Sequence, residues 1–143
     1  MSLLEELYRE TILSHYKSPK NFGPLADASV SIKGDNPSCG DQLELLLKLN
    51  GGRITEVRFQ GHGCAISIAS ASMMTELVKN KTLDQALELT RQFKAMVVDG
   101  AEPAPELGDL KALAGVSKLH ARTKCATLAW NTLEEAAKEA GTS

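Results

Sequence analysis

The sequence has no long hydrophobic run and no excess of charge of either sign. Its 16 Lys and Arg residues nearly balance 18 Asp and Glu residues, for a net charge of -2. Nucleic-acid and membrane surfaces usually attract a concentration of basic residues, so we expect neither partner. No segment approaches the length that crosses a bilayer, and residues 1–20 lack the apolar run and cleavage site of an export signal. These absences predict a cytoplasmic protein whose partners are proteins or small ions.

Cysteine is scarce, and its three copies form no closely spaced pair. An odd number of thiols in a chain without an export signal argues against a disulfide framework and favours reduced thiols with a metal or redox task. The spacing alone also allows three structural thiols scattered through a core. At 143 residues the chain is long enough to bury a core without disulfides, and we expect one domain over residues 1–143.

The hydrophobic periodicity predicts an α+β fold. Residues 28–33, 42–49 and 54–60 alternate apolar and polar side chains, and Asn50-Gly51-Gly52 supplies a hairpin turn between the last two. We therefore expect a small three-stranded antiparallel sheet with one face for packing. Helical spacing predicts covering helices over about 3–16, 66–79, 82–99 and 124–140, with a short one near 110–116.

Other residues indicate where helices begin and where connecting segments lie. Ser2 to Glu5 and Thr82 to Gln85 have the form of capping boxes at two helix starts. The methionine pair Met73-Met74 lies at helical spacing, which favours core packing over metal binding. Segments 17–25 and 101–108 are rich in turn formers, so we expect mobile connections there, the first irregular and the second extended. His15 and Tyr16 are expected to be surface or helix-end residues.

The stretch 34–41, Gly-Asp-Asn-Pro-Ser-Cys-Gly-Asp, places the Cys39 thiol and the Asp41 carboxylate two residues apart on a tight loop. Cys64 is expected at a helix N-terminus, where unpaired N–H groups favour the thiolate, and Cys125 in the first turn of the last helix. Helices packed on one face of the sheet could bring these side chains together at one end. Three thiolates and one carboxylate are ligands that zinc or iron takes in a tetrahedral site.

Basic residues and histidines near these positions leave alternatives open. Three thiolates and a carboxylate carry more negative charge than one Zn²⁺ neutralises, and Arg122 and Lys124 could offset the remainder. Arg122 could equally be a solvated charge at a helix start. His62 and His120 are possible ligands, although Asp41 already completes a set of four.

Several segments together resemble the U-type iron–sulfur cluster assembly proteins. They are Tyr-Lys-Ser-Pro-Lys-Asn-Phe-Gly at 16–23, the stretch 34–41, Gly-His-Gly-Cys-Ala-Ile-Ser-Ile-Ala-Ser-Ala-Ser at 61–72, and Arg-Thr-Lys-Cys-Ala-Thr-Leu-Ala-Trp at 122–130. The resemblance implies a compact α+β domain that receives persulfide sulfur from a pyridoxal-phosphate cysteine desulfurase. It also implies that Cys39, Asp41, Cys64 and Cys125 are the metal ligands, and that sulfur is accepted at Cys125, Cys39 or Cys64.

Two departures indicate the Suf-type branch of that family. In the Isc-type branch a histidine precedes the third cysteine and a Leu-Pro-Pro-Val-Lys segment lies before it. Here Lys124 precedes Cys125, and residues 114–118 read Ala-Gly-Val-Ser-Lys. The long segment 101–113 resembles the insertion of the Suf-type branch, whose members are associated with a Suf-type cysteine desulfurase and a zinc ion.

Three functions remain open from the sequence. The first is a zinc-dependent, sulfurtransferase-like acceptor of persulfide sulfur. The second is a non-enzymatic scaffold that binds iron or a nascent [2Fe–2S] cluster at the same residues and passes it to a downstream carrier or apoprotein. The third is a domain with purely structural zinc, although structural sites usually use closely spaced Cys and His pairs that are absent here.

Overall fold

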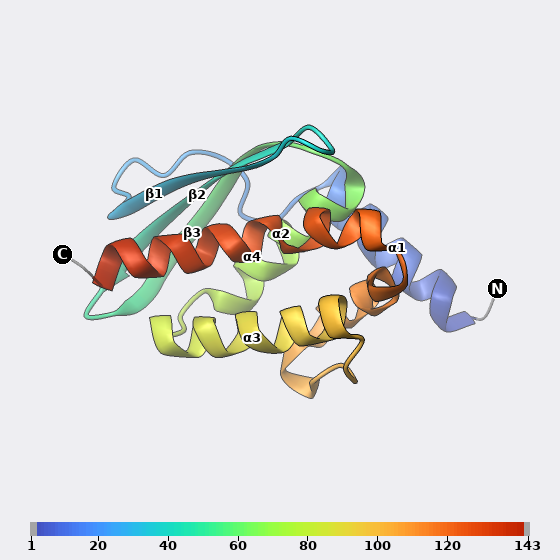
Figure 1. Cartoon of the computed structure of the whole chain (residues 1–143). Coiled ribbons are helices and arrows are strands. Elements are labelled where there is room, and N and C mark those ends of the chain that lie inside the picture. The colour runs from blue at the N-terminus through green and yellow to red at the C-terminus, as the bar shows by residue number, and fades with distance from the viewer. Residues whose placement is uncertain (1–2, 142–143) are drawn as a thin grey trace.

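A three-stranded antiparallel sheet forms one side of the molecule (Figure 1). The computed structural model describes residues 3–141. Strands β1 (Val30–Asn36), β2 (Asp41–Asn50) and β3 (Arg53–His62) lie in the order β1-β2-β3. Alternate β2 residues, Leu43, Leu45 and Leu47, are buried, because the strand period of two places all three on the face covered by helices.

Helices form two further layers beneath the sheet (Figure 1). Helices α2 (Ala65–Val78) and α4 (His120–Gly141) pack directly on the strands. Helix α1 (Leu3–Lys17) packs on α2, α3 (Leu83–Asp99) packs on α4, and the 3-10 segment η1 (Pro105–Lys118) contacts all four. This arrangement confirms the predicted α+β class. Among residues 3–141, no helix combines the length and the apolar composition needed to cross a membrane.

The core lies between the sheet and α3, with α2 at its centre. The Phe93 and Trp130 rings stack with centroids 4.8 Å apart and join α3 to α4. Met73 and Met74 are buried among apolar neighbours, as their spacing predicted. Thr82 and Gln85 form the predicted capping box at the start of α3. The other expected box includes Ser2, which lies outside the described residues.

The β1–β2 hairpin is longer than the sequence indicated. We expected a strand to end at residue 33 and a loop over 34–41, but β1 continues to Asn36 and β2 begins at Asp41. Asn36 and Asp41 are cross-strand partners, so Pro37 to Gly40 alone form the turn. Gly40 adopts φ +73° and the Cys39 N–H donates to Asn36 O at 3.2 Å. The hairpin therefore holds Cys39 on a short, well-defined turn.

Helix α4 begins at His120, four residues before the expected start at Lys124. A non-helical residue, Leu119, separates it from η1, and its N–H donates to Val116 O at 2.8 Å. Residues 120–123 contain no glycine or proline to interrupt a helix. Cys125 consequently lies in the second turn, and the expectation that it occupies the first turn is wrong.

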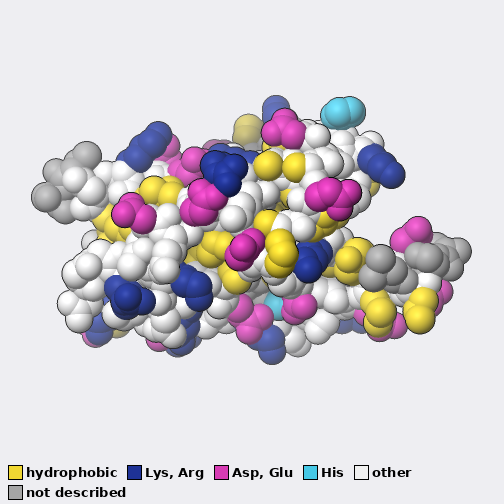
Figure 2. Space-filling model, turned by 90° about the horizontal axis from the view of Figure 1, so that it is seen from below, with side chains coloured by type: hydrophobic (Ala, Val, Ile, Leu, Met, Phe, Trp, Pro, Cys, Tyr) yellow, Lys and Arg dark blue, Asp and Glu magenta, His cyan; other side chains and the backbone are white. Residues whose placement is uncertain are grey.

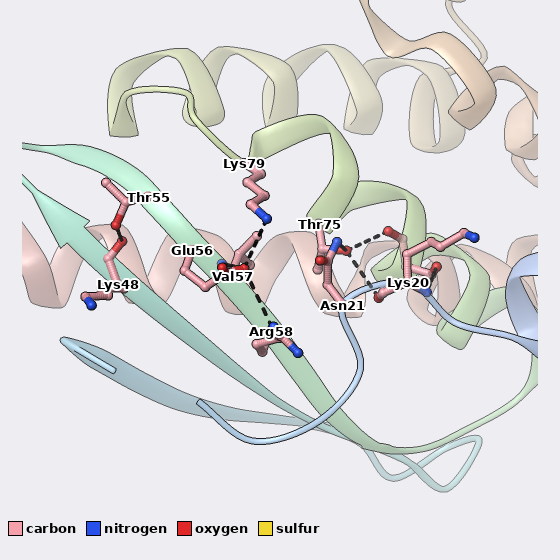
Figure 3. A network of polar contacts seen from close by, with 10 residues as sticks. Lys20, Asn21, Lys48, Thr55, Glu56, Val57, Arg58, Thr75 and Lys79 are labelled. Atoms are coloured by element: carbon pink, nitrogen blue, oxygen red, sulfur yellow. Dashed lines mark hydrogen bonds and ion pairs between the residues drawn. The ribbon is translucent and has the colours of Figure 1, made fainter. Parts of the chain in front are cut away.

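The connection after α1 is irregular, as predicted, but it is tied to the body of the molecule. The Lys20 N–H donates to Ser72 Oγ at 2.8 Å, and the Asn21 side chain reaches Thr75 Oγ1 of α2 at 3.0 Å (Figure 3). The Gly23 N–H donates to Phe59 O along the edge of β3. These bonds join residues far apart in sequence, which local composition could not reveal.

His15 lies in the last turn of α1, as expected for a helix-end residue, and it is buried, with Nδ1 2.6 Å from Ser72 Oγ. One further expectation about the connecting segments is corrected by burial. The segment 101–108 is not extended throughout, because helical turns of η1 start at Pro105 and bury Leu107. Gly108, with φ +55°, then breaks η1. The mobility expected for both connections stays a prediction that amide exchange can test.

The distribution of charged side chains on the surface agrees with the nearly equal numbers of basic and acidic residues. Figure 2 shows basic and acidic side chains interspersed on the face seen from below, without a field of one sign. Hydrophobic side chains gather on that face near the N-terminal end. Leu3 and Leu7 of α1 are exposed, since the first turns of that helix extend past the helices on which it packs (Figure 1).

Gly61→Ala should destabilise the sheet by about 2–4 kcal/mol, because a side chain does not fit there. Gly61 adopts φ +132°, and an added Cβ would lie 2.1 Å from Gln42 O of the neighbouring strand. Urea unfolding measures the effect. Gly115→Ala is the matched control, since an added Cβ meets no described atom within 4 Å. Equal stability of the two variants would show that the strands separate at this end at little cost.

Candidate metal centre

The three cysteines and Asp41 come from three different parts of the fold. Cys39 lies on the β1–β2 turn, and Asp41 is the first residue of β2. Strand β3 ends at His62, and Cys64 is the N-cap of α2. Cys125 enters from the second turn of α4. The antiparallel register brings the β1–β2 turn and the end of β3 to the same end of the sheet, where α2 and α4 pack against it.

Three donor atoms converge at this end of the sheet. One ligand atom each from Cys39, Asp41 and Cys125 lie within 4.8 Å of one another. The Cys39 and Cys125 sulfurs are 3.1 Å apart. Two thiolates bound to one zinc at about 2.3 Å each lie about 3.8 Å apart at a tetrahedral angle, so a small opening of this pair admits the ion. The spacing and the soft sulfur donors fit zinc.

Cys64 stands beside this group and is not a member of it. Its backbone N–H donates to Asp41 Oδ1 at 2.9 Å, and its side chain is one of the groups that raise the pKa of the Cys125 thiol. Its place at the start of α2 agrees with the sequence prediction. The fold therefore brings three of the four predicted ligands together and holds the fourth at the rim, half-buried.

Asp41 is fully buried and both of its carboxylate oxygens have polar neighbours. Oδ1 accepts the Cys64 N–H, and Oδ2 lies 3.5 Å from the side-chain amide of Asn36. The same amide lies 3.8 Å from Cys125 Sγ. Sequence reasoning did not single out Asn36. The signal that could have found it is the hairpin register, which pairs residue 36 with residue 41 on the same face of the sheet.

Cys125 lies near acidic groups and near one basic group, Arg122. Burial raises the pKa of the Cys125 thiol, and the adjoining groups of Cys39, Cys64 and Asp41 raise it further. Arg122, one turn earlier on α4, interacts with this thiol, which raises the pKa of the guanidinium. Arg122 is exposed and also interacts with this thiol, so its position fits both roles that the sequence left open for it. Lys124 is exposed near it on α4.

Zinc binding should release a proton from Cys125, since its raised pKa keeps the thiol protonated near neutral pH before the metal enters. The zinc affinity should therefore rise with pH, by about tenfold per pH unit for each proton displaced. Titration calorimetry in buffers of different ionisation enthalpy counts these protons. Cys125→Ala should release one fewer proton than the unmodified protein. An equal count would contradict a protonated Cys125.

The two histidines considered as ligands lie outside the converging group. His62 ends β3 and His120 begins α4, and both side chains are exposed. Among the described residues, the group whose ligand atoms lie within 4.8 Å of one another contains neither of them. Asp41 is therefore the oxygen donor that the fold presents to the thiols.

The comparisons with known proteins agree on one family. A family model, NifU-like N terminal domain, matches residues 7–139. The zinc-dependent sulfurtransferase SufU of Bacillus subtilis is 48% identical over 141 residues, which cover 96% of this chain and 95% of that protein. The iron–sulfur cluster assembly scaffold protein IscU of Streptococcus pyogenes is 43% identical over 139 residues, covering 96% and 87%.

A solved structure gives the same result at the level of the fold. The structure from Fervidobacterium islandicum, described as an iron–sulfur cluster assembly scaffold protein for the SUF system, superposes with a TM-score of 0.85 at 36% identity. The match covers 93% of this chain and 98% of that one. Sequence motifs, fold and relatives thus lead to one assignment, and the chain belongs to the NifU-like N-terminal domain family, on the side of its Suf-type branch.

Proposed function

We propose that this protein accepts persulfide sulfur from a Suf-type cysteine desulfurase, at a zinc site made by Cys39, Asp41, Cys64 and Cys125, for iron–sulfur cluster assembly. The observation that carries the proposal is the convergence of two thiols and a buried carboxylate within 4.8 Å, with one of the thiols exposed. The Bacillus subtilis relative, named a zinc-dependent sulfurtransferase, supports the same activity. Reduced thiols in such a role fit the cytoplasm.

The difference in exposure between the cysteines favours Cys39 as the first acceptor. Cys39 is exposed on its turn, whereas Cys125 is fully buried. A thiolate of this chain attacks the outer sulfur of the donor persulfide. A sulfur–sulfur bond forms to this chain's cysteine, the bond within the donor breaks, and its electron pair leaves on the desulfurase cysteine as a thiolate. Zinc, when bound, keeps the sulfur donors deprotonated at neutral pH.

Arg122 and Asn36 lie near the thiols and support this sulfur transfer. The Arg122 guanidinium faces the thiols and offsets part of the negative charge that four anionic ligands place at the site. The Asn36 amide lies between Asp41 Oδ2 and Cys125 Sγ and orients both. Cys39 projects from a turn held by the Asn36 carbonyl, so its thiol can meet a partner without unfolding the hairpin.

The test is the turnover of a Suf-type desulfurase, measured as alanine release, with and without this protein. We expect stimulation by the unmodified protein and none by Cys39→Ser. Ser38→Ala is the matched control, because it changes the neighbouring exposed turn residue and leaves the thiol in place. Unchanged turnover on addition of the unmodified protein contradicts the proposal.

The second candidate function is a scaffold for a nascent [2Fe–2S] cluster. The Streptococcus pyogenes relative is named a scaffold protein, and cysteine thiolates are the usual ligands of such clusters. Anaerobic reconstitution with iron and sulfide separates the two functions. A scaffold should show charge-transfer absorption that Cys39→Ser lacks and should pass the cluster to an apoprotein. A sulfur acceptor should stimulate the desulfurase without forming a stable chromophore.

A further inference from the structure

Positive charge gathers at the start of α4, beside the candidate metal centre. Residues 110–133 contain no Asp or Glu, and within them the segment 118–124 reads Lys-Leu-His-Ala-Arg-Thr-Lys, which we call the basic segment. Lys118, Arg122 and Lys124 are all exposed. Figure 1 shows the start of α4 at the same end of the molecule as the β1–β2 turn. The basic segment therefore lies on the side of the molecule that carries the thiols.

The placement of these charges opposes the preference of a helix. The N-terminus of a helix has partial positive charge, so acidic residues stabilise it and basic residues do not. The first turn of α4 contains Arg122 and no acidic residue. None of the ion pairs among residues 3–141 includes Lys118, Arg122 or Lys124. Residues that oppose a local preference without compensation in the fold commonly serve function.

The metal centre accounts for one of the three cations. Arg122 interacts with the Cys125 side chain, and its charge also acts on Cys64 and Cys39. Lys118 lies outside α4, where it is separated from the helix by Leu119. The Leu119 side chain is 54% exposed, so it contributes little to the core. An exposed leucine beside an unpaired lysine has the composition of a protein-binding surface.

We propose that the basic segment is the docking surface for the sulfur donor, and that Lys118, Leu119 and Lys124 contact an acidic surface with an apolar patch around the persulfide cysteine of the desulfurase. The inference rests on the proposed function, because it assigns the surface that brings that enzyme to Cys39. Cys39 is exposed on the β1–β2 turn at the same end of the molecule. Opposite charges would speed the encounter and orient the donor toward this thiol.

A second copy of this chain fits the basic segment less well. A two-fold contact at this segment would place the same lysines of both copies against each other, and like charges at an interface are unfavourable. The face seen in Figure 2 mixes acidic and basic side chains, so it does not offer a complementary acidic surface. The charge of the segment thus favours a different, acidic protein as the occupant.

The test is the binding of zinc-loaded protein to a Suf-type desulfurase, followed by stopped-flow fluorescence at several salt concentrations. Lys118→Glu and Lys124→Glu should each weaken binding about tenfold, through slower association that depends less on salt. Leu119→Ser should weaken it through faster dissociation, because an apolar contact is lost. The zinc content should be unchanged, and the melting temperatures of the two Glu variants should not fall, since acidic charge near the start of α4 favours the helix.

Lys138→Glu is the matched control, because it makes the same change of charge in the last turn of the same helix. It should bind like the unmodified protein. Equal weakening by Lys138→Glu would reveal an effect of net charge alone and would overturn the proposal. Unchanged binding by Lys118→Glu and Lys124→Glu would overturn it as well. So would a salt-sensitive dimer of the unmodified protein that Leu119→Ser dissociates, since the surface would then belong to a second copy.

The binding measurement uses the desulfurase without its cysteine substrate, so no sulfur is transferred and its outcome is separate from that of the proposed function. Weaker binding by the Lys118 and Lys124 variants of a protein that fails to stimulate turnover would uphold the docking surface and reject sulfur acceptance. Stimulation of turnover together with equal binding by all variants would uphold sulfur acceptance and reject the docking surface.

Discussion

Cys125→Ser should lose zinc affinity and sulfur acceptance together. The Cys125 sulfur is buried, lies 3.1 Å from Cys39 Sγ and interacts with Arg122, so no water or other thiol can readily take its place. A serine hydroxyl stays protonated near neutral pH and is a poor ligand for zinc. Four-ligand zinc sites are worth about 10–16 kcal/mol, or on the order of 3 kcal/mol per ligand, so we expect a loss of about a hundredfold in affinity.

Competition with a chelator measures this affinity, and desulfurase turnover measures sulfur acceptance. Cys39→Ser and Cys64→Ser should lose metal affinity as well. The Cys64 variant is informative because its thiol lies at the rim of the converging group, not within it. Thermal unfolding in excess chelator is the control for the fold of each variant. A Cys125→Ser protein that binds zinc as tightly as the unmodified chain would exclude Cys125 from the ligand set.

Asp41→Ala should keep its zinc and lose most of its sulfur acceptance. Asp41 supplies the one hard oxygen among soft sulfur donors, which makes it the ligand most readily displaced. Without it, water can complete the coordination while the three thiolates still hold the ion. The negative charge at the site falls by one, and with it the repulsion that helps a ligand leave.

Asp41→Ala should also lower the free energy of unfolding, because Asp41 is buried and hydrogen-bonded. Its Oδ1 accepts the Cys64 N–H at the start of α2, as an N-terminal capping group does, and loss of such a group costs about 1–2 kcal/mol. Asp41→Asn keeps the shape and an oxygen acceptor and removes only the charge, so it separates the two effects. Zinc content, unfolding free energy and desulfurase turnover are measured on both variants. Full turnover by a zinc-loaded Asp41→Ala would remove Asp41 from the exchange step.

Local patterns in the sequence determined the elements of this protein. The alternation in 42–49 and 54–60 predicted β2 and β3, and the Thr82–Gln85 capping box predicted the start of α3. Burial of Met73 and Met74 followed from helical spacing. These features depend on residues close together in the chain, so backbone propensity and periodicity suffice to identify them. The types of donor atom at the candidate metal centre are also a property of the sequence.

Tertiary contacts decided how those donors are arranged. The β1–β2 register, not the loop composition, placed Asn36 opposite Asp41. The early start of α4 moved Cys125 into the second turn, where burial raises the pKa of its thiol. Ser67 is buried because α2 packs against the sheet and α4, and within residues 3–141 its hydroxyl has no hydrogen-bond partner. The burial of Cys125 and of Ser67 depends on segments that are tens of residues apart in the chain, and burial and hydrogen-bond partners exist only after those segments have packed.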